Sequence, residues 1–258
     1  MNSSTRTMVA VFGVLVILVV AVYLLWIRPG TDDAEDTQVV EQLTPAPEPS
    51  PTPTLAERLS ERLAGTTLRT SDAAVRELVE ELSSNPKLVA WLTNEDLIRR
   101  FVAAVDNIAN GYSPTSQLEF MRPKGAFKVI EKGDQTLIDP ASYERYDLAT
   151  QVFVSLDTEG AIALYRELEP LIDEAYREIS PPGSRFADRL DAAVEHLLAT
   201  PSLDGSPRVE RKVVTYVYED SALEGLSAAQ RQLLRMGPDN ATQIRAKLRD
   251  LMAEWKGP

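Results

Sequence analysis

The sequence predicts a mostly α-helical fold: a multi-helix domain with a small antiparallel β-sheet of about three strands, preceded by one transmembrane helix. Three patterns lead to this fold class. Residues 8–27 carry no charged side chain. Through most of residues 55–258, apolar residues recur at helical spacing. Two short stretches alternate between apolar and polar side chains instead, which is typical of strands.

The uncharged segment reads MVAVFGVLVILVVAVYLLWI and spans residues 8–27. As a helix rising ~1.5 Å per residue it would measure roughly 30 Å, which is the thickness of the hydrocarbon core of a bilayer. A cleaved signal peptide has a shorter apolar region, of about 7–15 residues, and a small-residue cleavage site. Here the run continues into Arg28-Pro29-Gly30. We therefore expect an uncleaved transmembrane helix, with residues 1–7 as its N-terminal tail.

The basic residues that flank this segment indicate its orientation. Arg6 and the α-amino group precede the span, whereas Arg28 alone follows it closely. Because basic flanks tend to stay in the cytoplasm, the N-terminus is expected to be cytoplasmic and the C-terminal domain periplasmic. The expected localisation is the bacterial inner membrane, as a single-pass protein. The reverse topology would make the protein a cytosolic adaptor.

Residues 28–54 form an expected linker that is acidic and rich in proline. In its second half, TPAPEPSPTPT, every second position from Pro45 to Pro53 is proline. Proline restricts its own φ angle and the conformation of the preceding residue. The stretch should therefore be an extended polyproline-II-like rod, rising ~3.1 Å per residue. We interpret the linker as a spacer between the membrane and the following domain.

Helical periodicity predicts most elements of residues 55–258, which are expected to form a single domain. The strongest pattern covers 94–110, where Leu97, Phe101, Val105 and Ile108 lie on one face. Further helices are expected from residue 55 onward and over 71–82, 86–91, 143–156, 158–179, 184–198, 227–236 and 240–255.

The β-sheet is expected from two stretches. Residues 127–131 alternate in polarity, and Lys132-Gly133-Asp134-Gln135 then forms a turn into residues 136–138, which predicts a hairpin. The stretch VERKVVTYVYE, residues 209–219, predicts a third strand beside this hairpin. No internal repeat with a period of roughly 20 to 50 residues is visible.

Composition excludes several classes of function. The chain has no cysteine and a single histidine, so it cannot form disulfides, a thiol nucleophile or a multi-histidine metal site. Its net charge of −12 disfavours nucleic acid as a partner, because an acidic domain repels a phosphate backbone. The sequence contains no phosphate-binding glycine loop. No cofactor, metal or catalytic residue is therefore predicted, and His196 is expected to be an ordinary surface or packing residue.

Three stretches carry a resemblance to a known family. They are WLTNEDLIRRFVAAVDNIANG (91–111), IDPASYERYD (138–147) and QLLRMGPDNATQIRAKLRDL (232–251). Together they resemble a proteobacterial, membrane-anchored family called domain of unknown function 3014, over about residues 60–255. The resemblance implies a shared fold and an envelope location, and it transfers no catalytic residue.

Candidate partner-binding residues lie in the first and second of these stretches. On the helix over 94–110, two alanines leave a shallow notch between Arg99 or Arg100 on one side and Asp106 or Asn107 on the other. A carboxylate or amide of a partner could enter this notch. The alternative is a polar seam that packs against another element of the same domain.

Tyr143 and Arg145 complete the candidate set. Tyrosine and arginine together suit the recognition of sugars or carboxylates. The alternative is structural, because Asp139 and Asp147 on either side are natural helix N-caps.

The expected function is non-catalytic: binding or scaffolding of an envelope partner, either a protein or a cell-wall polymer. Tethering to a membrane raises effective concentration, so that modest affinity suffices. The alternative is an envelope hydrolase that acts on peptidoglycan or peptides through carboxylates or a Ser–Lys pair.

Overall fold

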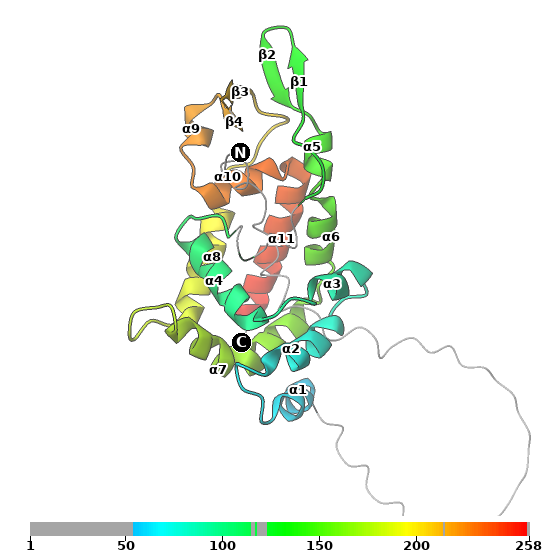
Figure 1. The fold of residues 1–258 in the computed structure, drawn as a ribbon, viewed down its shortest axis with the longest axis vertical. Coiled ribbons are helices and arrows are strands. Elements are labelled where there is room, and N and C mark those ends of the chain that lie inside the picture. Colours follow the sequence, from blue (N-terminus) through cyan, green and yellow to red (C-terminus); the bar gives the residue numbers. More distant parts are fainter. Residues whose placement is uncertain (1–53, 115–116, 118–122, 214, 257–258) are drawn as a thin grey trace, which may run out of the picture.

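The computed structural model describes residues 54–256, except 115–116, 118–122 and 214. This part of the chain is mostly helical and carries two small hairpins at one end (Figure 1). The helices are α1 (Leu55–Leu63), α2 (Ser71–Glu80), α3 (Pro86–Trp91), α4 (Leu97–Ala109), α5 (Ala141–Glu144), α6 (Asp147–Val154), α7 (Thr158–Arg177), α8 (Phe186–Leu198), α9 (Ser221–Glu224), α10 (Ala228–Arg235) and α11 (Pro238–Trp255). The strands are β1 (Val129–Lys132), β2 (Gln135–Ile138), β3 (Val209–Lys212) and β4 (Thr215–Tyr218).

Helices α4, α7, α8 and α11 form the centre of the core. Helix α4 packs along α8 and also contacts α7, while α11 contacts both α7 and α8. Three buried aromatic rings meet where α4, α7 and α8 converge: the centroid of Phe186 lies 5.3 Å from that of Phe101 and 5.4 Å from that of Tyr176. Tilted aromatic pairs contribute beyond the area they bury, so this cluster fixes how the three helices cross.

The N-terminus of α4 is capped by a residue from another helix. Asp96 adopts a left-handed conformation, with φ of 57°, and its side chain does not cap the helix. The carboxylate of Asp72 in α2 instead accepts hydrogen bonds from the backbone N–H groups of Asp96 (2.7 Å) and Leu97 (2.9 Å). The helix therefore begins at Leu97 and not at Asn94 as expected, because the tertiary contact with α2 supplies the cap.

The prediction of one sheet with about three strands is wrong. Strand β1 pairs with β2, and β3 pairs with β4, in two separate two-stranded antiparallel sheets. A single bridge between Leu137 and Arg208 connects them. The stretch 209–219 folds back on itself instead of adding one strand to the first hairpin. The sequence hides this turn, because Lys212-Val213-Val214-Thr215 contains none of the residues that mark hairpin turns.

The transmembrane helix of the predicted fold class gains no support from the structure. Within the described part of the chain, no helix is both long enough and apolar enough to cross a membrane. The expected transmembrane helix, residues 8–27, lies outside the described residues, as does the expected linker up to residue 53. The findings therefore support a mostly helical fold with two small antiparallel sheets, and they do not support a preceding transmembrane helix.

The helix expected over 143–156 is divided into α5 and α6. The backbone N–H of Tyr146 donates to the carbonyl of Tyr143 at 2.9 Å, which closes a tight turn between them. The second hairpin is likewise followed by a four-residue helix, α9, in front of α10. Both short helices connect a hairpin to the helical core.

Candidate functional site

Arg99 joins α4 to the end of α7. Its guanidinium donates to both carboxylate oxygens of Glu178, at 2.7 and 2.8 Å, and to Asp96 at 3.1 Å. These hydrogen bonds raise the pKa of Arg99 and lower the pKa of Glu178. The side chains of Arg99 and Glu178 are 37% and 44% exposed, so water screens the pair and its net contribution is small.

Arg100 and Asn107 are occupied by local backbone contacts. Arg100 donates through Nε to the carbonyl of Glu95 (2.8 Å) and through a terminal nitrogen to the carbonyl of Gln117 (3.3 Å). The carbonyl of Asn107 accepts the N–H of Tyr112 (2.8 Å) at the end of α4. These contacts shape the two ends of the helix.

Asp106 joins α4 to α8. Its carboxylate accepts the Nε–H of Arg189 at 2.7 Å, and Arg189 also donates to the side-chain oxygen of Asn110. The side chains of Asp106 and Arg189 are each 28% exposed, so this pair is more shielded from water than the Arg99 pair. The polar seam expected as the alternative to a binding notch is thus present, and it faces an open groove.

The groove, called here the α4–α8 groove, has a volume of about 540 Å³. It lies between the C-terminal part of α4, the end of α7, the α7–α8 connection and the first turns of α8. Its lining residues are Asp106, Asn110, Tyr176, Ile179, Ser180, Pro181, Ser184, Arg185, Asp188 and Arg189.

The groove mixes charged, polar and apolar groups. The charged groups of Arg185 and Asp188 lie 3.9 Å apart, and both side chains are mostly exposed. Ile179 is a large apolar side chain that is 54% exposed. Burial, followed by the charge of Asp106, raises the pKa of the Tyr176 phenol, which therefore stays neutral at the groove wall. Such a lining can hydrogen-bond and anchor a ligand, and it contains no arrangement of nucleophile and base.

Tyr143 and Arg145 serve the fold and lie outside this groove. The ring of Tyr143 packs on Gly237, where an added Cβ would meet Cγ of the ring at 2.5 Å. Arg145 donates to the carbonyls of Ser142 and Gly125, both at 3.0 Å, and its guanidinium lies 5.9 Å from the ring centroid of Phe127. The structure thus brings Arg99 and Asp106 to one region and places Tyr143 and Arg145 in another.

Two buried cations of α11 hold the ends of other helices. Arg245 donates to the carbonyl of Thr200 (2.8 Å), just beyond α8, and Lys247 donates to the carbonyl of Leu156, just beyond α6. Burial lowers the pKa of both cations. Cations are favourable at helix C-termini, where carbonyl groups lack partners. Two of the basic residues in the stretch 232–251 therefore serve to hold helix ends.

Arg245 also lines a small hollow of about 20 Å³ at the start of α11. Its second terminal nitrogen donates to Ser202 at 3.0 Å. The space is enough for little more than a water molecule.

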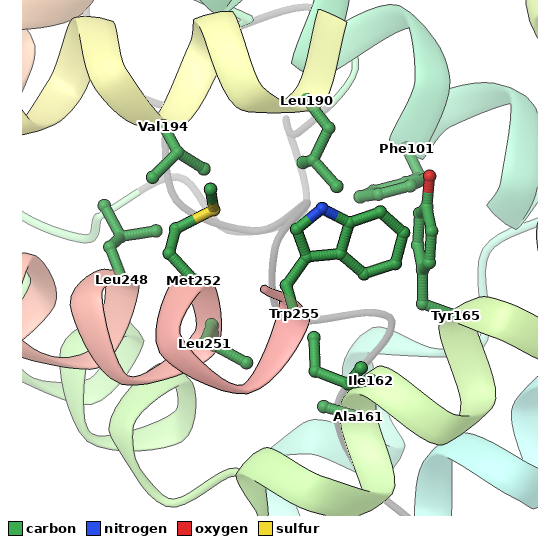
Figure 2. A pocket seen from close by; sticks show the side chains of 10 residues that line it. All are labelled: Phe101, Ala161, Ile162, Tyr165, Leu190, Val194, Leu248, Leu251, Met252 and Trp255. Atoms are coloured by element: carbon green, nitrogen blue, oxygen red, sulfur yellow. The ribbon is translucent and has the colours of Figure 1, made fainter. Parts of the chain in front are cut away.

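An apolar hollow of about 40 Å³ lies among α4, α7, α8 and α11 (Figure 2). The indole of Trp255 lies in its middle and meets the ring of Tyr165 edge-on, with centroids 4.8 Å apart. Only apolar atoms line the space. The hollow offers no polar group to orient a ligand, and its walls are core residues and the partly buried side chains packed against them.

His196 and Ser227 form a contact that sequence spacing could not reveal. The ring Nε2 of His196 lies 2.7 Å from Oγ of Ser227. Ser227 is the N-cap of α10, and its Oγ also accepts the N–H of Gln230 at 3.1 Å. The carbonyl of His196 accepts from the Gln230 amide, so no carboxylate is among these partners. Neither residue lines the α4–α8 groove or the two smaller hollows.

The residues that sequence reasoning missed are the partners of Arg99 and Asp106, which lie at the end of α7 and in α8. Glu178 lies 79 positions beyond its partner Arg99, and Arg189 lies 83 positions beyond its partner Asp106. Charge pairing with Arg99 and Asp106 is the only signal that pointed toward them, and 39 acidic and 27 basic residues make such pairing unspecific.

Among the described residues, no group of three or more histidine, cysteine or acidic side chains is placed to hold a metal ion.

Comparison with known proteins gives one match. A family model described as "Protein of unknown function (DUF3014)" matches residues 97–252. Searches of curated proteins and of solved structures returned no match. The matched range begins with the first residue of α4 and ends within α11, so it includes the α4–α8 groove. The chain belongs to the DUF3014 family.

Proposed function

We propose that this domain is a non-catalytic binding domain, and that the α4–α8 groove takes an extended segment of a partner protein. One observation carries the proposal: a groove of about 540 Å³ has Asp106, one of the candidate residues from the sequence, on its wall. Pockets that bind ligands are concave and combine apolar surface with a few placed polar groups. The α4–α8 groove has this composition.

The chemistry of the groove favours a peptide over a cell-wall polymer. Sugars are commonly held by exposed aromatic faces, whereas Tyr176, the aromatic residue that lines this groove, is only 5% exposed. Exposed Ile179 offers an apolar anchor. Arg185 and Asp188 offer a donor and an acceptor of opposite charge, each available to a polar backbone or side chain. This combination suits a protein segment that carries one apolar side chain among polar ones.

Site-specific photo-crosslinking in cells tests the proposal. A photoreactive phenylalanine analogue replaces Ile179 in the groove, and the same analogue replaces Val213 in a control chain. Val213 lies between β3 and β4 and is 95% exposed, more than Ile179. Random encounters would therefore label position 213 at least as strongly. A discrete crosslinked protein is expected from position 179 only.

A charge reversal sharpens this experiment. Arg185→Glu changes a mostly exposed groove residue, and Arg211→Glu makes the same change on exposed strand β3. The crosslink at 179 should fall at least about tenfold with Arg185→Glu, which corresponds to about 1.4 kcal/mol, and should persist with Arg211→Glu. Equal labelling at 179 and 213, or equal loss with both charge reversals, contradicts the proposal.

The hydrolase alternative is favoured by the contact between His196 and Ser227. A serine beside a histidine is the arrangement of an activated nucleophile. A fluorophosphonate probe that reacts with activated serines distinguishes the two functions: labelling that disappears in Ser227→Ala supports the hydrolase. Because Ser227 caps α10, we expect the probe not to label the wild-type chain. Ser227→Ala should lower the free energy of unfolding by about 1 kcal/mol.

The partner is proposed to be a protein of the bacterial envelope, and the domain to be periplasmic. Alkaline phosphatase fused after Pro258 tests this location, since that enzyme is active only after export. An inactive fusion that is present at normal amounts would favour the cytosolic adaptor.

A further inference from the structure

We infer that the domain contains two tandem copies of one structural unit, and that the α4–α8 groove lies at the junction between them. The first unit covers residues 97–177 and the second covers residues 186–255. Each has the same order of elements: a helix, a two-stranded hairpin, a very short helix, a helix of intermediate length and a long helix. In Figure 1 both hairpins lie at the same end of the molecule, with α5 and α9 on either side.

The lengths of matching elements agree closely. Helices α4 and α8 have 13 residues each, all four strands have four, α5 and α9 have four, and α6 and α10 have eight. The long helices α7 and α11 have 20 and 18 residues. Two unrelated halves of a helical domain would match in this way only by a series of coincidences.

The spacing along the chain is also constant. The hairpin strands begin at Val129 and Gln135 in the first unit, and at Val209 and Thr215 in the second. The very short helices begin at 141 and 221, and the long helices begin at 158 and 238. The same number of positions, that from Val129 to Val209, therefore separates each of these elements from its counterpart.

Two pairs of helices, α6 with α10 and α4 with α8, depart from this offset. Helix α10 begins one position later than the offset requires. Helix α8 begins later still, because the connection that follows α4 is longer than the one that follows α8. The repeat is longer than the period of roughly 20 to 50 residues that is typical of repeat arrays, so a search at those periods does not find it.

Matching positions carry matching buried residues. Leu168 and Leu248 occupy equivalent places in α7 and α11, and both are 0% exposed. In the first helix of each unit the tripeptide Ala-Ala-Val recurs at 103–105 and 192–194. Phe153 and Leu233 are likewise both fully buried. The equivalence therefore holds for the residues that form the core.

The two hairpins end in the same backbone hydrogen bond. The N–H of Asp139 donates to the carbonyl of Lys128 at 3.1 Å. At the matching positions of the second unit, the N–H of Glu219 donates to the carbonyl of Arg208, also at 3.1 Å. Each bond closes the open end of a hairpin. Each bond continues the register of its hairpin by one rung, so the two ladders extend equally far from their turns.

The junction explains why the groove occurs where it does. Asp106, Asn110 and Tyr176 come from the first unit, and Asp188 and Arg189 come from the second. The connection between the units supplies the remaining wall. Binding sites are frequent where two structural units meet, and this connection exists once in the chain. The assignment of a ligand to the junction rests on the proposed function, whereas the tandem repeat stands without it.

Grafting one helix onto its counterpart tests the repeat in the full chain. Residues 98–109 of α4 replace residues 187–198 of α8, so that each residue takes the place of its counterpart and apolar residues stay at buried positions. Phe186 is kept because it belongs to the aromatic cluster. The chain is expected to fold cooperatively, with a melting temperature lowered by less than about 10 °C, as followed by circular dichroism.

The control graft has nearly the same composition and is shifted by one position. Residues 99–110 replace 187–198, which brings the carboxylate of Asp106 to position 194, where Val194 is 3% exposed. This chain is expected not to fold. If the two grafts are equally stable or equally unfolded, the reciprocal grafts of 187–198 onto α4 are compared in the same way. Indistinguishable grafts in both directions overturn the repeat.

The outcome is independent of partner binding. A failed crosslink at position 179 with a successful in-register graft removes the proposed function and keeps the repeat. A successful crosslink with indistinguishable grafts keeps the proposed function and removes the repeat.

Discussion

The two long helices α7 and α11 occupy matching places in the two units, yet they are held by different chemistry. Position 165 in α7 is a tyrosine whose hydroxyl is buried without a hydrogen-bond partner, and burial raises its pKa. The matching position in α11 is Arg245, which bonds the end of α8. Two positions further along, Lys247 bonds the end of α6. Helix α11 therefore ties both units together, whereas α7 depends on apolar packing.

The residues in front of these helices differ in the same sense. Asp157 precedes α7 in an extended conformation and caps it by accepting the N–H of Gly160 at 2.6 Å. Gly237 precedes α11 with a φ of 93°, under the ring of Tyr143. The matching positions in front of α7 and α11 thus hold a side-chain cap in the first unit and a close contact between the units in the second. At this position the second unit contacts the first, whereas the first unit caps its own helix.

Exchanging the residue types at positions 157 and 237 should give the largest difference in stability between the two units. Gly237→Asp introduces a side chain at positive φ and against the Tyr143 ring, which should cost at least about 3 kcal/mol of unfolding free energy. Asp157→Gly removes a cap and adds flexibility, at a cost of about 1 kcal/mol. Urea denaturation of both variants checks the order. Equal losses of unfolding free energy in the two variants would mean that the contact between Gly237 and the Tyr143 ring is not specific.

The next largest effect is expected at positions 165 and 245. Arg245→Met leaves the carbonyl of Thr200 and the hydroxyl of Ser202 without their donor, so it should lower stability by about 2–3 kcal/mol. Tyr165→Phe removes a buried hydroxyl that has no partner, so it should be neutral or stabilising by up to about 1 kcal/mol. Thermal melts of both variants measure this contrast. A large loss in Tyr165→Phe would show that the hydroxyl does have a partner.

The smallest effect is expected for the exposed pair of Arg99 and Glu178. Arg99→Ala should cost about 0.5 kcal/mol at most near pH 7, and less at high salt. Because Arg99 lowers the folded-state pKa of Glu178, the contribution is present above about pH 4.3, the ordinary value for glutamate, and is lost as pH falls through the lowered pKa. Wild type and variant should therefore converge at low pH.

A matched control exists for this prediction. Asp188 occupies the position in α8 that matches Arg99 in α4, and its contact with Arg185 is long and exposed. Asp188→Ala should leave stability nearly unchanged across the same pH range. Denaturation curves across pH for the two variants test this, and a pH-independent loss in Arg99→Ala would contradict the ionic explanation.

Helical spacing located nearly all the long helices, because burial of one face imposes a periodic pattern that neighbouring residues must satisfy together. The end of α4 at Gly111 is an example: φ is 75° there, and a glycine indicates it in the sequence. The start of α4 was misplaced, because its cap comes from Asp72 in a different helix. The second hairpin was missed for lack of turn residues at 213–214. Local signals predict local structure only.

The candidate site was also predicted only as far as local signals reach. Arg99 and Asp106 were recognised as a charged notch from spacing on one helix, but their partners Glu178 and Arg189 were not. Tyr143 and Arg145 carry the same residue types as a binding site, and the structure uses them for packing. Residue type and spacing on one element do not distinguish these roles, since the distinction depends on what a distant segment places nearby.

By itself, the sequence determined the helical class of the domain, its family and the absence of thiol chemistry, because these follow from composition and from patterns within single segments. The tertiary structure decided where the groove lies, which charged residues face it, and how two similar units meet. Those features depend on contacts between residues that are far apart in the sequence, and such contacts are set by the packing of whole helices. The groove exists because α4 and α8 pack together at the junction, and no segment of the chain encodes that packing alone.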